Sequence, residues 1–163
     1  MKQFLLFVSV FLLSNNSYSD TMSGPRLGIT YLSPNMVDFA ASKGAYVEPV
    51  ITQFGWQFEK KFLTTTSGPE GVTALIPLVG GIEQSEFIPS LTWLIGLRLR
   101  NGYEFGVGPN VSVGTSGMSF TMGHSNKFGE LYVPKNIGLT ISNEGVRLSF
   151  LFGFNSKFES KPK

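Results

Sequence analysis

The sequence predicts an all-β protein, an antiparallel up-and-down barrel (a meander) of about eight strands with one short helix in its first long loop. Apolar and polar residues alternate with a period of two over most of the chain, which is typical of β-strands. Turn-forming residues separate the alternating runs at regular intervals. The apolar faces of successive runs stay in phase across these turns, so one continuous two-faced sheet is expected, and a sheet of this size that closes has no exposed edge.

The hairpin at 87–114 has the clearest pattern. Apolar residues occupy the odd positions of 87–99 and of 103–113, on either side of Asn101-Gly102. A two-residue loop would set the apolar face of one strand beside the polar face of the next, whereas a three-residue loop at 100–102 aligns the two apolar faces. Such a loop is a type I turn followed by a glycine in the left-handed conformation, and it sets Arg98 opposite Glu104.

The other strands follow the same logic. Pro77 and Gly80-Gly81 indicate a bulge or bend in the third strand. Two-residue turns are expected at 115–116, 129–130 and 144–145, and the remaining strands are expected at 24–32, 47–63, 71–82, 117–128, 131–142 and 146–158. A helix is predicted within 33–44, because Ser33 can cap it, Pro34 suits its first turn and Gly44 can end it.

The N-terminus carries the features of an export signal. Lys2 precedes an apolar run at 4–13, and Ser17 and Ser19 suit cleavage after Ser19. The chain is therefore divided into a signal peptide at 1–19, a β-barrel domain at 20–158 and a polar tail at 159–163. With 13 basic and 11 acidic residues, the charge balance does not indicate nucleic-acid binding. The absence of cysteine excludes a disulfide framework.

Two kinds of barrel fit a two-faced sheet. A soluble, lipocalin-like barrel in the periplasm or secreted would point its apolar face inward around a small hydrophobic ligand. A membrane barrel would point that face into lipid. The membrane alternative is favoured because the polar face is built from Gly, Ser, Thr, Asn and Gln with few charges, and because apolar faces of nine or more residues match the roughly 9–11 that a tilted strand needs to cross a bilayer.

The membrane interpretation assigns side chains to both faces. Opposite charges on the polar face are expected to form a buried ionic cluster in the lumen, since buried charges are tolerated when paired. This lumen cluster comprises Arg26, Glu59, Lys61, Arg98, Glu104 and Arg147. The lipid-facing aromatic residues are expected to include Phe54, Trp56, Trp93, Phe105, Phe150, Phe152 and Phe154.

The last strand, VRLSFLFGFNSKF, has alternating aromatics, Gly153 and a terminal Phe158. Together with the signal peptide, the lack of cysteine and the alternating strands, it resembles small bacterial outer-membrane β-barrel proteins. The resemblance implies a monomer in the outer membrane of a Gram-negative cell, with membrane lipids and the barrel-assembly machinery as partners. The chain departs from that pattern because 159–163 follow the aromatic and Ser156 stands where a hydrophobic residue is typical.

The expected function is a structural or interaction role in the outer membrane, with a lumen filled by side chains. An enzyme is not expected. A lipid-modifying enzyme is the third alternative, but His124 and Ser125 point to opposite faces of a strand and cannot form a nucleophile–base pair directly. One histidine, no cysteine and no carboxylates at ligand spacing argue against a metal site, and no cofactor is expected.

Overall fold

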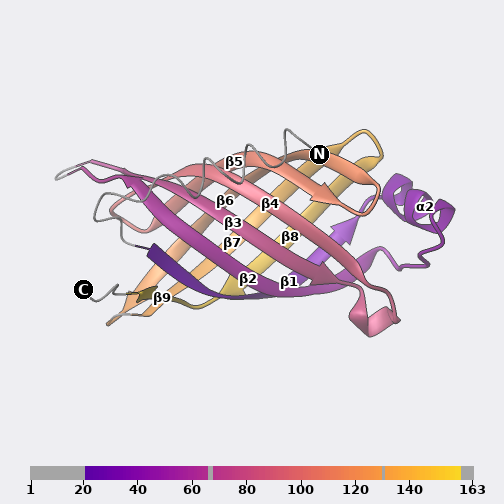
Figure 1. Cartoon of the computed structure of the whole chain (residues 1–163), viewed down its shortest axis with the longest axis horizontal. Coiled ribbons are helices and arrows are strands. Elements are labelled where there is room, and N and C mark those ends of the chain that lie inside the picture. The colour runs from indigo at the N-terminus through magenta and orange to yellow at the C-terminus, as the bar shows by residue number, and fades with distance from the viewer. Residues whose placement is uncertain (1–20, 66–67, 130, 159–163) are drawn as a thin grey trace, which may run out of the picture.

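The strands close into an eight-stranded, antiparallel, up-and-down barrel, with one short helix after the first strand (Figure 1). This computed structural model describes residues 21–65, 68–129 and 131–158. The signal peptide at 1–19, cleavage after Ser19 and the tail at 159–163 lie outside the described residues. The closed antiparallel barrel with one short helix is the fold class that the sequence predicted.

From β1 to β8 each strand pairs with the next along the chain, and β9 continues the line of β8 by pairing with β7. The strand β1 closes the barrel by pairing with β2 on one side and with β8 and β9 on the other. The elements are β1 (Thr21–Leu32), α2 (Pro34–Ser42), β2 (Val50–Leu63), β3 (Glu70–Gly80), the 3-10 helix η1 (Ile82–Gln84), β4 (Ile88–Arg98), β5 (Tyr103–Ser112), β6 (Thr115–Phe128), β7 (Leu131–Ser142), β8 (Gly145–Gly153) and β9 (Asn155–Phe158).

The two ends of the barrel differ. The helix α2 lies at one end, and β9 lies at the other (Figure 1). The α2 end also carries η1 and the turns at 113–114 and 143–144, whereas the β9 end carries the turn at 99–102. No helix among the described residues is long and apolar enough to cross a membrane.

The turn at 100–102 has the conformation that the alternation of apolar and polar residues predicted. The Gly102 amide donates to the Leu99 carbonyl at 3.0 Å, and the Leu99 amide donates to the Tyr103 carbonyl at 2.7 Å. Gly102 has a φ of 88°, which a residue without Cβ adopts at little cost. The resulting register pairs Arg98 with Glu104.

Two of the three other turn predictions were wrong in position. The turn expected at 115–116 lies at 113–114, because Gly114 supplies the positive φ of 70° that a tight hairpin turn needs. The turn expected at 144–145 lies at 143–144, and Gly145 begins β8. The third turn, predicted at 129–130, includes a residue outside the described ones, but Phe128 pairs with Leu131 on either side of it. Both errors shift the pairing by an even number of residues, so neither moves a side chain to the other face.

Two strands differ from expectation in their regularity. A bulge or bend was expected in the third strand; β3 pairs with β4 without a bulge, and the irregularity in the β2–β3 pairing lies between Lys61 and Leu63 of β2. The chain bends after β3 at Gly81, which has a φ of 80°. The last strand, expected to run through 146–158, is interrupted at Phe154 between β8 and β9.

Side chains alternate between the outside of the barrel and its lumen. Large apolar residues such as Phe54, Phe105 and Leu148 are about half exposed on the outside. Polar residues between them, such as Gln57 and Thr30, are buried in the lumen. The strand β3 is apolar on both faces, so the lumen also holds an apolar cluster, Ala74, Ile76, Leu78 and Leu94.

Candidate functional site

Near the β9 end of the lumen, Arg98 on β4 holds two glutamates. Its Nη1 and Nη2 donate to the two carboxylate oxygens of Glu59 at 2.6 and 2.8 Å, a bidentate pair. Its Nε donates to Glu104 Oε1 at 2.8 Å. The side chains of Arg98 and Glu59 are only 8% and 2% exposed, so the pair is shielded from water.

The same bonds continue across the barrel. Gln57 Nε2 donates to Glu59 Oε2 at 3.1 Å, and Arg26 Nε donates to Gln57 Oε1 at 3.0 Å. The Nη2 of Arg26 then donates to Asn155 Oδ1 at 2.8 Å. We call this chain, Asn155–Arg26–Gln57–Glu59–Arg98–Glu104, the ionic network. It joins β9, β1, β2, β4 and β5, and its two arginines balance its two glutamates.

The structure does not bring all six charges of the expected lumen cluster together. Arg26, Glu59, Arg98 and Glu104 belong to the ionic network. Lys61 instead pairs with Glu70 at 2.9 Å, beside an open hollow of about 470 Å³ at the β9 end. The sixth residue, Arg147, lies in a separate part of the lumen toward the α2 end.

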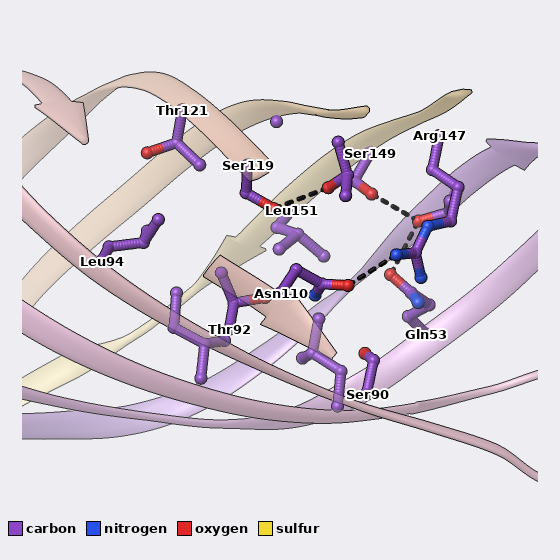
Figure 2. A pocket seen from close by; sticks show the side chains of 15 residues that line it. Gln53, Ser90, Thr92, Leu94, Asn110, Ser119, Thr121, Arg147, Ser149 and Leu151 are labelled. Carbon is purple, nitrogen blue, oxygen red and sulfur yellow. Dashed lines mark hydrogen bonds between the residues drawn. The ribbon is translucent and has the colours of Figure 1, made fainter. Parts of the chain in front are cut away.

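In that second part of the lumen, nine of the fifteen lining residues carry hydroxyl or amide groups, and Ile76, Leu78, Leu94 and Leu151 complete the wall on the apolar side (Figure 2). Thr30 Oγ1 donates to Gln53 Oε1 at 2.6 Å and lies 2.7 Å from Ser149 Oγ. Ser119 and Thr140 share a further hydrogen bond of 2.7 Å. These groups surround a cavity of about 50 Å³ that we call the hydroxyl cavity.

Arg147 enters the hydroxyl cavity from β8 (Figure 2). Its Nη2 donates to Asn110 Oδ1 at 2.5 Å, and Asn110 Nδ2 donates to Thr92 Oγ1 at 2.7 Å. The cavity lining contains no carboxylate. Glu144, on the turn before β8, acts on Arg147 through its charge, but the two residues form no salt bridge in the described part of the chain.

The α2 end is closed over by an apolar cluster. Met36 of α2 packs with Leu32, Val47 and Ile51, and all four side chains are buried. Ser33 begins the helix, as expected, but its hydroxyl accepts from the Val146 amide at 3.0 Å rather than capping the helix with a side-chain bond. The helix is thereby tied to the first residues of β8.

The connection between α2 and β2 is tied down by η1 and its neighbours. Glu86 accepts from the Tyr46 amide at 2.9 Å, and Gln84 accepts from the Glu48 amide at 2.7 Å. Glu83 accepts from both the amide and the hydroxyl of Thr52. Partial desolvation opposes ionisation of Glu83, but the two bonds from Thr52 prevail and lower its pKa.

A similar bond stabilises the neighbouring turn. The Thr115 hydroxyl donates to Glu144 Oε2 at 2.5 Å, and this bond is the main reason why the pKa of Glu144 lies below its usual value. Both carboxylates therefore favour their ionised forms at the α2 end.

The outer face carries the aromatic residues expected to meet lipid. Trp93 is half-buried and donates through its indole N–H to Thr73 Oγ1 at 2.9 Å. The other six are 43–51% exposed, namely Phe54, Trp56, Phe105, Phe150, Phe152 and Phe154. Charged residues on this face are confined to Lys60 and Lys135 among the described strand positions, both toward the β9 end.

His124 is held by packing contacts. Its Nε2 lies 3.1 Å from the Asn101 carbonyl oxygen, and its ring meets the Tyr103 ring edge-on at 4.9 Å. Ser125 is buried on the opposite face, as strand geometry predicted. Among the described residues, no group of three histidine, cysteine or acidic side chains is placed to hold a metal ion.

Sequence reasoning missed the neutral partners of the charges. Gln57, Asn155 and Asn110 lie on the polar faces of their strands, so alternation could have placed them in the lumen. Their pairing with arginines could not be found that way, because these bonds join residues far apart in sequence.

One comparison with a solved structure supports the fold. The chain resembles Ail, the attachment invasion locus protein of Yersinia pestis, an eight-stranded outer-membrane barrel, with a TM-score of 0.55 and 9% identity over 86% of this chain and 97% of that one. A structure of Ail in complex with the heparin analogue sucrose octasulfate gives a TM-score of 0.47 and 8% identity over the same shares. No protein-family model and no curated protein matches the sequence. The fold is that of small outer-membrane barrels.

Proposed function

We propose that the mature chain is an integral barrel of the outer membrane, with a structural or interaction role and no enzymatic activity. The observation that carries the proposal is the sidedness of the barrel. Large apolar side chains stay about half exposed around the outside, while Arg26, Glu59 and Arg98 are buried within. Such an outer surface is unfavourable in water and suits the hydrocarbon core of a bilayer.

The position of the outward charges supports the same proposal. Lys60 and Lys135 lie near the β9 end, where His124 pairs with Lys135 across β6 and β7. Long lysine side chains can reach the headgroup region from such positions. The β9 end would then lie at one membrane boundary, and the α2 end would project beyond the other.

We infer that the ionic network closes the lumen to ions. It crosses the barrel from β9 to β5 with nearly every side chain buried. Eight strands leave room for little besides side chains. The lipocalin-like alternative is not supported, because the lumen offers a small cavity of about 50 Å³ with many polar groups rather than an apolar site for a hydrophobic ligand.

The test is expression of the full chain, with its leader, in a Gram-negative host. The protein should fractionate with outer membranes, require detergent for extraction, and migrate faster in gels when unheated than when boiled. A purified protein that stays monomeric and folded without detergent would contradict membrane insertion. Steady ion conductance in planar bilayers would contradict a closed lumen while leaving membrane insertion intact.

A further inference from the structure

We propose that the hydroxyl cavity binds a small monovalent anion of halide size, held by Arg147. The proposal rests on the unbalanced charge of this part of the lumen. In the ionic network two arginines meet two glutamates, but no carboxylate lines the cavity that Arg147 enters. Glu144 acts on Arg147 only from a distance, and a buried charge without a salt-bridge partner is unfavourable. An anion bound beside Arg147 reduces that penalty.

The guanidinium also has donors to spare. Arginine carries five N–H donors. Among the described residues, Arg147 makes one hydrogen bond, from Nη2 to Asn110, and its Nε is buried without any partner. The residue is only 7% exposed, so bulk water reaches it poorly. Arg26, by contrast, uses Nε, Nη1 and Nη2 in hydrogen bonds to the protein.

The surroundings suit an anion rather than a cation. Hydroxyls of Thr30, Ser119 and Ser149 can rotate to donate toward a negative ion, and their present partners are other hydroxyls or amide oxygens. Figure 2 shows Ser119, Ser149 and Asn110 lining the space into which Arg147 reaches, and Thr30 belongs to the same lining.

The size of the cavity limits the ligand. Its volume of about 50 Å³ exceeds the roughly 10–15 Å³ of probe-occupied space that one water needs. A single halide ion with a companion water fits that space, whereas a sugar acid such as gluconate is too large. Arg147 also lines a second cavity, of about 80 Å³, beside Met36 of α2.

The experiment compares thermal unfolding of the full-length expressed protein, purified from host membranes in a neutral detergent, in chloride and in gluconate at equal ionic strength. Chloride should raise the unfolding midpoint with saturation, by about 5 °C once it is in large excess over its dissociation constant. Bromide should do the same, and crystals grown in bromide should show anomalous density beside Arg147.

Two variants test the assignment to Arg147. Arg147→Gln removes the charge, so its midpoint should be equal in chloride and gluconate. Gln53→Glu places a carboxylate in the same cavity and retains the acceptor for Thr30, so the anion should likewise lose its effect. Lys127→Gln, which removes an exposed cation at the other end, should keep the full chloride dependence and controls for general screening.

Measurements on the unmodified protein alone can overturn the proposal. Equal midpoints in chloride and gluconate, or a cavity that holds only water in bromide-grown crystals, would overturn the proposal. A chloride effect that survives in both Arg147→Gln and Gln53→Glu would also overturn it, because the ion would then act elsewhere. Should Arg147→Gln fail to fold, Gln53→Glu and the bromide density still give a result.

Discussion

The two halves of the lumen bury arginines in different ways. Near the β9 end, Arg98 is matched by two carboxylates and every bond is charge-assisted. Near the α2 end, Arg147 meets an amide and a set of hydroxyls. An arginine therefore acts as a rigid cross-link in one half of the lumen, whereas in the other half an arginine keeps unused N–H donors.

The largest loss of stability is expected when the ionic network loses one of its charges. Arg98→Met leaves Glu59 buried without its partner, so the free energy of unfolding should fall by about 3–5 kcal/mol. Urea unfolding of the protein refolded in detergent micelles measures the loss. The exposed Lys127→Met is the matched control; it removes only a contact with the Tyr132 ring and should change stability by at most about 1 kcal/mol. Equal losses in the two variants would contradict a buried cross-link at Arg98.

A pair of glycines tests packing in the two halves. A Cβ at Gly153 would lie 2.0 Å from the Pro25 carbonyl oxygen and 2.6 Å from Arg26 Nη1, so Gly153→Ala should cost about 1–3 kcal/mol. At Gly138, beside the hydroxyl cavity, a Cβ would meet nothing closer than Thr121 Cγ2 at 3.5 Å. Gly138→Ala should be neutral, or stabilising by up to about 1 kcal/mol. Chemical denaturation of both variants side by side checks the contrast, which a similar loss at Gly138 would refute.

Beside the hydroxyl cavity, loss of a neutral side chain should reduce stability less than loss of Arg98 does in the ionic network. Asn110→Ala removes the hydrogen bonds to Arg147 and to Thr92, and should lower the free energy of unfolding by about 1–3 kcal/mol. The same urea titration should therefore rank this variant between Arg98→Met and Gly138→Ala. A loss as large as that of Arg98→Met would show that Asn110 is as important as a paired charge.

The smallest effect is expected outside the lumen, at the turn before β8. Thr115→Val removes the main hydrogen bond that lowers the pKa of Glu144, so this pKa should rise toward the ordinary glutamate value. The lowered folded pKa contributes stability above the unfolded pKa of about 4.3, and that contribution is lost as pH falls through the folded pKa. Carboxyl carbon chemical shifts followed against pH measure the change, and an unchanged titration would exclude Thr115 as its cause.

The sidedness of the barrel could be predicted from sequence because it depends on parity alone. Counting residues around Asn101-Gly102 is enough to place Arg98 opposite Glu104, and the structure has this pairing. The turns at 113–114 and 143–144 lie away from their predicted positions, but the face on which each side chain lies is still the predicted one. Their exact positions depended on which residue took the positive φ, and several glycines compete for that role.

The bonds across the lumen could not be predicted in this way. Arg98 reaches Glu59, 39 residues away, because closure of the barrel brings β4 and β2 toward one interior. The stagger of the closed sheet decides which inward side chains share a level, and alternation carries no information about it. For the same reason, the sequence placed Arg147 with the other charges, although its height in the lumen separates it from them.

The seam between β1 and the end of the chain has a consequence for the order of folding. Arg26 bonds to Asn155, 129 residues later. The strand β1 can therefore pair with β8 and β9 only after those later strands are present. Contacts between residues so far apart form slowly, because a long loop must close before they are gained. Closure is therefore a late event, and until it happens β1 keeps an open edge that a helper protein or another strand can occupy.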